Sequence, residues 1–188
     1  MRLSAPRVTP LEISEMNEEQ RDLVERASFD KPININKTLA HHPKLLKRWL
    51  VFASHVMNKS TLPARDRELV ILRMGWLCQA EYEWAQHVII GKKSGLTEAE
   101  IDRIPGGADV GGWSEKDRAL IAATDELKND AFISDATWNL LKKSYDDQQM
   151  MDLIFAAGNY NLVSMALNSL GVQLDPGLEG FRKTAGTS

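Results

Sequence analysis

An acid and a histidine lie one helical turn apart near the middle of the chain. Glu83 and His87 are four residues apart in the segment AEYEWAQH, so on a helix their side chains share a face. Their neighbours on that face include Trp84, Ile90 and Gly91, which are uncharged. Ionisable groups beside apolar neighbours undergo the pKa shifts that let a histidine act as an acid or a base. The pair is therefore the first candidate for chemistry, and an ordinary surface Glu–His pair is the alternative.

The remaining histidines and the cysteine show no comparable pattern. His41, His42 and His55 have no acidic partner at helical spacing, and Cys78 is the only cysteine. A single cysteine can form neither an intrachain disulfide nor a multi-cysteine zinc site. The glycine-rich segment 105–113 lacks the lysine and the hydroxyl residue of a phosphate-binding loop. We therefore interpret these histidines as structural or solvated.

The composition is that of a single globular domain. The chain has 188 residues, of which 43% are hydrophobic, enough to bury a core without disulfides or a structural metal. Its formal charge of −3 gives no electrostatic reason to expect nucleic acid as a partner. The N-terminus lacks the apolar run of a signal peptide, and no stretch approaches the roughly 18 apolar residues that span a bilayer. We expect no membrane partner and a cytoplasmic location.

The spacing of apolar residues and of helix caps predicts an all-α fold without strands. Helices are expected over residues 18–27, 43–57, 63–93, 97–104, 115–129, 136–145 and 147–170, with a loop over 30–36. The segment 63–93 is one helix on propensity alone, because it contains no proline and only Gly75 as a weak breaker. We expect an N-terminal arm over 1–16, one helical domain over 17–175 and a loosely ordered C-terminal tail over 176–188.

Two of the expected helices begin with a similar pattern. Asp66-Arg67-Glu68-Leu69 resembles the later segment Asp117-Arg118-Ala119-Leu120, and each opens an apolar helix. If the two segments descend from a duplication, only the first retains the acid. Coincidence between two amphipathic helix starts is the alternative.

The segment RDRELVILRMGWLCQAEYEWAQHVIIGKKSGLTEAEI resembles the core of the carboxymuconolactone decarboxylase and alkylhydroperoxidase D superfamily, over about residues 60–105. The resemblance lies in Arg-Glu-Leu, a histidine nineteen residues after that glutamate, and Gly-Leu-Thr followed by an acidic pair. It implies an alkylhydroperoxidase D-like helical bundle that assembles as a homo-oligomer, either a trimer or a hexamer. It also implies that Glu68 is a proton-relay partner of His87.

The chain belongs, on this resemblance, to the subgroup that lacks the Cys-x-x-Cys motif. The two cysteine positions of the peroxidase branch fall on Ala80 and Glu83, and Cys78 lies two residues before the first. Without a dithiol there is no disulfide cycle to reduce a peroxide. The decarboxylase branch uses neither a metal nor an organic cofactor. The resemblance therefore implies a cofactor-free lyase or isomerase for a small lactone or oxo acid, with His87 as general acid or base and Glu68 as its relay partner.

Further roles and alternatives remain open. Glu83 would orient the substrate or stabilise charge. Tyr82, Trp84 and Trp76 would form apolar walls around a small-molecule substrate, with core packing as the alternative, especially for Trp76. A peroxidase-related oxidoreductase and a non-catalytic oligomeric binding protein are alternative functions. The two acids and the histidine could also ligate a metal, as Glu and His do across bundle helices.

The resemblance conflicts with a single helix over 63–93. In a straight helix, Glu68 and His87 would lie roughly 28 Å apart and could not cooperate. Since the family turns the chain just before its histidine, we expect a turn near Cys78-Gln79, on the resemblance alone. We also expect a wet site, whose ionisable groups contribute little to stability.

Overall fold

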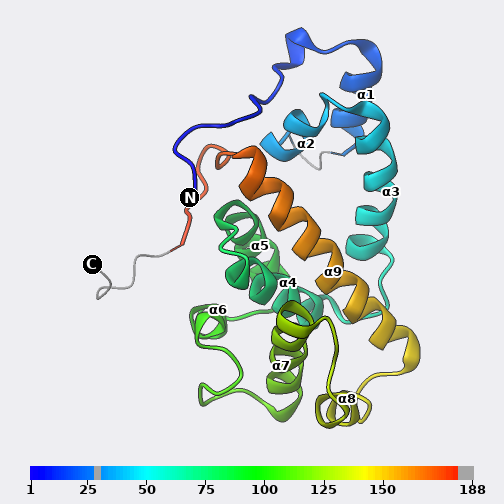
Figure 1. The fold of residues 1–188 in the computed structure, drawn as a ribbon, viewed down its shortest axis with the longest axis vertical. Helices are drawn as coiled ribbons and strands as arrows, with labels where there is room; N and C mark the ends of the chain where they lie inside the picture. Colours follow the sequence, from blue (N-terminus) through cyan, green and yellow to red (C-terminus); the bar gives the residue numbers. More distant parts are fainter. Residues whose placement is uncertain (28–30, 182–188) are drawn as a thin grey trace.

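The computed structural model describes residues 1–27 and 31–181, which form helices and no strand, so the all-α prediction is confirmed (Figure 1). The α-helices are α1 Glu18–Arg26, α2 Asn34–Leu39, α3 Pro43–Asn58, α4 Ala64–Leu77, α5 Glu81–Lys93, α6 Glu98–Arg103, α7 Glu115–Asp130, α8 Asp135–Leu141 and α9 Asp147–Leu170. Two short 3-10 helices are η1 Ile13–Glu15 and η2 Ile104–Gly106. None of the described helices is long and apolar enough to cross a membrane.

Polar side chains set the starts of these helices. Asn17, Thr97 and Asp146 each head a capping box, in which the cap side chain and the residue three positions later satisfy each other's backbone amides. Ser114 and Ser134 accept a backbone amide at the starts of α7 and α8. These caps explain why the predicted helix starts agree well with the observed ones.

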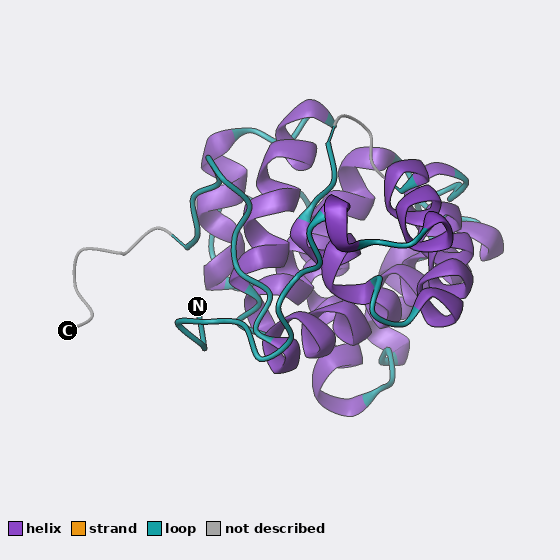
Figure 2. Ribbon diagram, turned by 90° about the horizontal axis from the view of Figure 1, so that it is seen from above, coloured by secondary structure: helices purple, strands orange, loops and turns teal. Residues whose placement is uncertain are grey.

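Helix α4 lies at the centre of the fold. It packs against α5, α7 and α9, and every residue from Asp66 to Gly75 is buried. Figure 2 shows the helices gathered around this interior when the molecule is seen from above. Because α4 has no exposed face along this stretch, the charged residues that it carries must find partners inside the protein.

The two matching segments form neighbouring helix starts that exchange ion pairs. Arg65 Nη1 lies 2.7 Å from Asp117 Oδ1, and Lys116 Nζ lies 2.8 Å from Asp66 Oδ2. Within the two patterns, Arg65 corresponds to Lys116 and Asp66 to Asp117, so each helix start supplies one cation and one acid to the other. This reciprocal arrangement fits a duplication, which remains an interpretation.

The helix predicted over 63–93 is wrong as a single element. Helix α4 ends at Leu77 and α5 begins at Glu81. Gln79 adopts φ 51°, in the left-handed region, and its side chain donates a hydrogen bond of 2.8 Å to the carbonyl of Trp76. A left-handed residue after the last turn is a standard way to end a helix. The turn that the family resemblance implies is therefore present.

The chain is held in the interior at Asp175, just before the expected C-terminal tail over 176–188, whose loose order stays a prediction. Asp175 is 7% exposed and accepts hydrogen bonds from the backbone amide of Asn34, at 2.9 Å, and from the Tyr82 hydroxyl, at 2.5 Å. A buried carboxylate that is saturated by donors fixes the chain around it. The expected loop over 30–36 was also too long, since α2 begins at Asn34. Residues 30 and 182–188 lie outside the described residues.

The N-terminal arm lies on the body of its own chain. The backbone amides of Arg7 and Val8 both donate to the carbonyl of Leu170, at 2.9 and 3.2 Å, and the amide of Leu11 donates to the carbonyl of Lys37. The arm therefore satisfies carbonyls at the ends of α9 and α2.

Substitution of Gln79 tests the turn between α4 and α5. We expect Gln79→Val to lower the free energy of unfolding by about 1–2 kcal/mol, because a β-branched residue is strained at positive φ. Gln79→Gly is the matched control, since glycine adopts this conformation freely. Chemical denaturation measures both variants. A valine variant as stable as the glycine variant would contradict the assignment of strain to this position.

Candidate acid–base site

The turn between α4 and α5 brings the three predicted site residues into one hydrogen-bonded row. His87 Nδ1 lies 2.6 Å from Glu68 Oε2, and His87 Nε2 lies 2.9 Å from Glu83 Oε1. Glu68 comes from α4, while Glu83 and His87 come from adjacent turns of α5. Both ring nitrogens are thus engaged, each by a different carboxylate, and the imidazole lies between two acids.

Glycine at position 91 favours a close approach of the two helices at this row. A Cβ atom added to Gly91 of α5 would lie 3.2 Å from Leu72 Cδ1 and 3.8 Å from the Cβ of Glu68 on α4. Gly75 of α4 lies opposite Glu83, and a Cβ there would be 3.6 Å from the Cγ of that residue. A side chain at Gly91 would crowd Leu72 of α4, whose Cδ1 atom would have to shift, so glycine at this position favours the close approach that lets the carboxylate of one helix reach the imidazole of the other.

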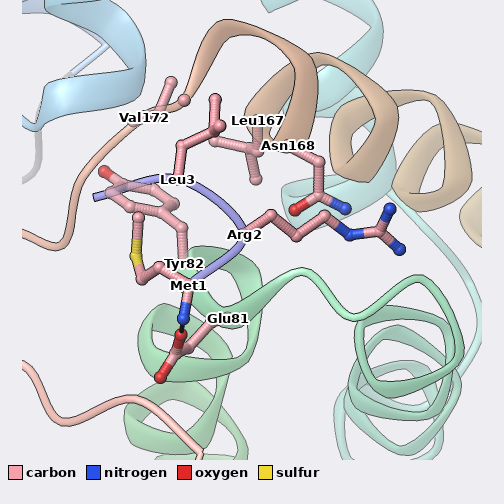
Figure 3. Close-up of a pocket in the computed structure, with 9 residues that line it drawn as sticks. Met1, Arg2, Leu3, Glu81, Tyr82, Leu167, Asn168 and Val172 are labelled. Carbon is pink, nitrogen blue, oxygen red and sulfur yellow. Dashed lines mark ion pairs between the residues drawn. The ribbon is translucent and has the colours of Figure 1, made fainter. Parts of the chain in front are cut away.

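The turn itself is held by segments far away in the sequence (Figure 3). The carbonyl of Cys78 accepts hydrogen bonds from Arg2 Nη2, at 3.2 Å, and from Asn168 Nδ2, at 2.9 Å. The amino group of Met1 forms an ion pair with Glu81 at the first residue of α5. The cavity beneath these contacts has a volume of only about 10 Å³. The arm and the end of α9 therefore pack closely over the turn that positions His87.

The row is buried, which contradicts the expectation of a wet site. The exposed fractions are 0% for Glu68, 4% for Glu83 and 6% for His87. Burial alone lowers the pKa of the imidazole, but the charges of Glu68 and Glu83 and their hydrogen bonds outweigh it and raise that pKa from 6.5 to about 10. At neutral pH the site therefore holds an imidazolium between two carboxylates.

Arg67 is a member of this site that sequence reasoning missed. Its Nε and Nη2 atoms each lie 3.3 Å from Glu68 Oε1, and the residue is 7% exposed. The positive charges of Arg67 and His87 balance the negative charges of Glu68 and Glu83. Because consecutive helical residues point in different directions, the adjacency of Arg67 and Glu68 in the sequence gave no indication that their charged groups meet.

Tyr160 is a second residue that sequence reasoning missed. Its ring meets the ring of His87 edge to face, with centroids 4.8 Å apart and an interplanar angle of 80°. Its hydroxyl donates to Met57 Sδ at 2.8 Å. Burial and the charges of both glutamates raise the pKa of Tyr160 well above its ordinary value, so it remains a neutral phenol. No local pattern could have identified it, since it lies on α9.

The three aromatic residues predicted as substrate walls make other contacts. The Tyr82 hydroxyl is committed to Asp175 at the opposite side of α5. Trp76 and Trp84 pack together, with centroids 5.6 Å apart, and Phe181 of the C-terminal segment packs against both. These contacts give the aromatic side chains structural roles, and their contact with a substrate stays a prediction.

The geometry of the row does not suit a metal ion. A metal binds the unprotonated nitrogen of an imidazole, whereas both nitrogens of His87 are hydrogen-bonded to carboxylates. Within residues 1–27 and 31–181, no group of three or more His, Cys, Asp and Glu residues is arranged to hold a metal. The arrangement fits the storage and transfer of a proton instead.

Comparison with known proteins agrees with this hairpin. The model of the carboxymuconolactone decarboxylase family matches residues 43–126. No curated protein matches the chain. An uncharacterized peroxidase-related protein from Ralstonia eutropha JMP134, with an alkylhydroperoxidase AhpD core, superposes with a TM-score of 0.80 and 16% identity, covering 91% of this chain and 93% of that one.

Two further solved structures show the same fold. An uncharacterized peroxidase-related protein from Silicibacter sp. TM1040 has a TM-score of 0.77 and 14% identity, covering 93% of this chain and 95% of its own. A variant of the debrominase Bmp8 in complex with 2,3,4-tribromopyrrole has a TM-score of 0.74 and 13% identity, covering 90% and 91%. At these identities the likeness establishes the fold.

The charge state of His87 can be tested directly. Because its folded pKa of about 10 exceeds 6.5, the stabilisation from its charged form is complete below pH 6.5 and is lost as the pH rises through 10. We expect long-range ¹⁵N NMR to show both ring protons on His87 at pH 8. The free energy of unfolding should fall between pH 7 and pH 10, and fall less in His87→Gln. A neutral His87 tautomer at pH 7 would contradict the assignment.

Proposed function

Residues 43–126 belong to the carboxymuconolactone decarboxylase family, and from that premise we propose that the chain is a cofactor-free lyase or isomerase for a small lactone or oxo acid. The observation that supports the proposal is the buried imidazolium between Glu68 and Glu83, at 2.6 and 2.9 Å. Decarboxylation and double-bond migration both require a proton to be placed on carbon, and a positioned histidine is suited to that step.

His87 supplies this proton. When the substrate carboxylate leaves as carbon dioxide, the electron pair of the broken bond remains on the adjacent carbon as an enolate. His87 donates a proton to that carbon and becomes neutral, and a proton from solvent restores the imidazolium. In an isomerisation, the carboxylate of Glu83 removes a proton from one carbon while the imidazolium of His87 donates a proton to another, and transfer of the proton from Glu83 to His87 restores both groups. An imidazolium with a pKa of about 10 keeps its proton at neutral pH until such a strong base forms.

The two glutamates take different parts in this mechanism. Glu68 is 0% exposed and is also bonded by Arg67, so it holds the imidazolium from behind and does not meet the substrate. Glu83 lies on the other ring nitrogen, where it can pass a proton from solvent to His87 after the imidazolium has donated its own proton to carbon. The row thus acts as a relay that runs from Glu68 through His87 to Glu83.

Tyr160 is suited to bind the oxygen of the substrate. Its hydroxyl donates to the thioether of Met57, which is a weak acceptor. A substrate carbonyl or carboxylate oxygen is a stronger acceptor and would take over this hydrogen bond once Met57 is displaced. A neutral phenol beside His87 would then stabilise the negative charge that develops on the enolate oxygen.

A peroxidase-related activity is the alternative that the fold raises. The structural neighbours described as peroxidase-related share the fold only, and this chain has Ala80 and Glu83 where the resemblance places the redox cysteines. Cys78 is buried, and its Sγ lies 3.3 Å from Asn161 Oδ1. A lone buried thiol cannot complete a disulfide cycle. A non-catalytic binding protein is the second alternative, favoured if no substrate is turned over.

We also propose that the chain works as a homo-oligomer, a trimer or a hexamer as the family resemblance implies, in the cytoplasm and on a small molecule. Its formal charge of −3 supports neither nucleic acid nor an anionic surface as the partner. Large apolar side chains exposed on α3 and α9 support assembly.

Substitutions in the row should separate the roles of its members. We expect His87→Gln to reduce turnover by about 10²–10⁴-fold, and Glu68→Gln to lose less because it keeps its shape and part of its hydrogen bonding. His55→Gln is the control, since that histidine is 57% exposed. Carbon dioxide release and ultraviolet absorbance on a panel of carboxylated lactones and oxo acids measure turnover.

The free energy of unfolding must be measured together with turnover, because the residues of the row are buried and their substitution also lowers stability. Removing the imidazole with His87→Ala leaves two buried carboxylates facing each other, which we expect to cost about 3–5 kcal/mol of unfolding free energy. If the wild type turns over nothing in the panel while the variants only lose stability, the row is a structural network and the binding-protein alternative is favoured.

The alternative of a dithiol-dependent peroxidase activity has a direct test. We expect no hydrogen peroxide reduction with dithiothreitol or a thioredoxin system as reductant, and no effect of Cys78→Ser, because the chain contains no second thiol. Peroxide consumption can be followed by coupled oxidation of the nicotinamide reductant. If the wild type reduces peroxide and the Cys78→Ser variant does not, the exclusion of peroxidase chemistry is overturned.

A further inference from the structure

The acid–base site is closed to any molecule that must touch His87. His87 is 6% exposed, and Tyr160, whose ring meets the imidazole edge to face, is 5% exposed. On the side of Nδ1, Glu68 and Arg67 bind each other in the interior, and separating buried charges is costly. Tyr160 makes only neutral hydrogen bonds. A substrate therefore reaches the imidazole most readily if the contact that holds Tyr160 is broken.

Met57, in the last turn of α3, makes that contact. Its Sδ accepts the hydrogen bond of the Tyr160 hydroxyl at 2.8 Å, and a thioether sulfur is a weak acceptor. The methionine side chain is unbranched and adapts its rotamer easily. The contact closes the site, yet a carbonyl or carboxylate oxygen of a substrate is a better partner for the same hydroxyl.

The C-terminal half of α3, residues 51–58, is attached to the rest of the protein at few points. Within this segment Val56 is the only buried residue. Phe52 meets the ring of Phe155 edge to face at 6.1 Å. The side chain of His55 is 57% exposed and lies 3.7 Å from a carboxylate of α9. A segment that buries so little apolar surface can open without unfolding of the whole domain.

The contact between α3 and α9 is also incompletely packed and satisfied. A groove of about 350 Å³ lies between the two helices, with Trp49 and Asn159 in its lining, and Figure 1 shows α3 along one edge of the molecule beside α9. Within the part of the chain that the structure describes, Trp49 Nε1 and Asn159 Oδ1 are buried and have no hydrogen-bond partner. Such groups destabilise the closed arrangement, and water satisfies them once the helices separate. Because Asn159 directly precedes Tyr160, the groove reaches the part of α9 that carries the covering ring.

Anchors on both sides define the ends of a segment that can move. Leu46, in the first half of α3, is 0% exposed in a small core with Leu23 and Val24 of α1. After α3, the backbone amide and the hydroxyl of Thr61 donate to Asp152 at 2.5 and 2.8 Å. The chain between these anchors can bend while α4 and α5 stay in place, so its movement leaves the Glu–His–Glu row intact.

On the premise of the proposed function, we propose that residues 51–58 are a gate over the acid–base site, with Met57 as its latch on Tyr160. Movement of this segment away from α9 withdraws the sulfur, frees the hydroxyl and widens the existing groove toward His87. The substrate enters between α3 and α9, and its oxygen takes the hydrogen bond that Met57 held. Return of the gate excludes water while the proton is transferred to carbon.

Exchange of the His87 ring protons with water, followed by NMR, measures the gate without any turnover. Met57→Ala removes the latch and should speed this exchange at least about tenfold, because the ring protons then no longer wait for the gate to open. Met57→Leu keeps the volume and removes only the acceptor, so it should speed exchange less. Met151→Ala is the matched control, since this methionine is 60% exposed on α9 and should leave the rate unchanged. The backbone amide of Leu72, buried in α4, reports global unfolding and should change far less than the ring protons.

A reversible cross-link tests whether α3 itself moves. In a Cys78→Ser background, the substitutions Phe52→Cys and Phe155→Cys place two thiols where two rings are in contact. Oxidation to the disulfide should slow exchange of the His87 ring protons at least about tenfold, and reduction should restore the rate. Light scattering before and after oxidation confirms that the assembly is unchanged.

The outcomes separate the gate from the reaction. Equal exchange rates in the wild type and Met57→Ala, with no effect of the cross-link, would overturn the gate even if a substrate were found. If exchange responds as expected while the panel of lactones and oxo acids yields no turnover, the gate stands and the lyase or isomerase assignment falls. With a substrate in hand, the cross-link should also lower kcat/KM reversibly, and an unchanged kcat/KM would show that the substrate enters by another route.

Discussion

The burial of three ionised side chains in one hydrogen-bonded row is the constraint on which the rest of the structure depends. Taking Glu68, His87 and Glu83 out of water carries a large desolvation penalty, which only close contact between opposite charges offsets. The row achieves this with one imidazolium between two carboxylates, at 2.6 and 2.9 Å. Arg67 supplies the second positive charge. Loss of any member leaves a buried charge uncompensated, so substitutions in the row lower stability as well as the proposed activity.

The backbone is arranged to satisfy that constraint. An imidazole between carboxylates from two helices requires those helices to be neighbours at close range, and the chain turns at Gln79 in a left-handed conformation to make them so. Gly91 then removes the side chain that would hold the helices apart. The carbonyl of Cys78, left without a helical partner by the turn, is bonded by Arg2 and Asn168, so the arm and α9 complete the hairpin.

The sequence predicted the parts of the fold that local chemistry decides. Caps such as Asn17 and Asp146 satisfy their own helices, and most predicted starts agree with the structure for that reason. The break at Gln79 could not be predicted from propensity, because glutamine is not a typical left-handed residue and the long-range contacts of the turn, from Arg2 and Asn168, are made at the neighbouring Cys78 carbonyl. The resemblance to a known family was therefore needed to pair Glu68 with His87. Tyr160 and Asp175 could not be foreseen, since their partners lie far away in the sequence.

The acid at position 83 connects this electrostatic arrangement to the chemistry that we propose. The family resemblance places a redox cysteine at this position, where a neutral thiol would leave His87 with Glu68 as its only charged partner in the row. With Glu83 present, a second negative charge lies on the other ring nitrogen and contributes to a pKa of about 10. The proton that Glu68 and Glu83 hold on His87 is the one that the proposed function delivers to carbon, so the acid at position 83 is the residue through which the electrostatics of the row and the proposed chemistry are linked.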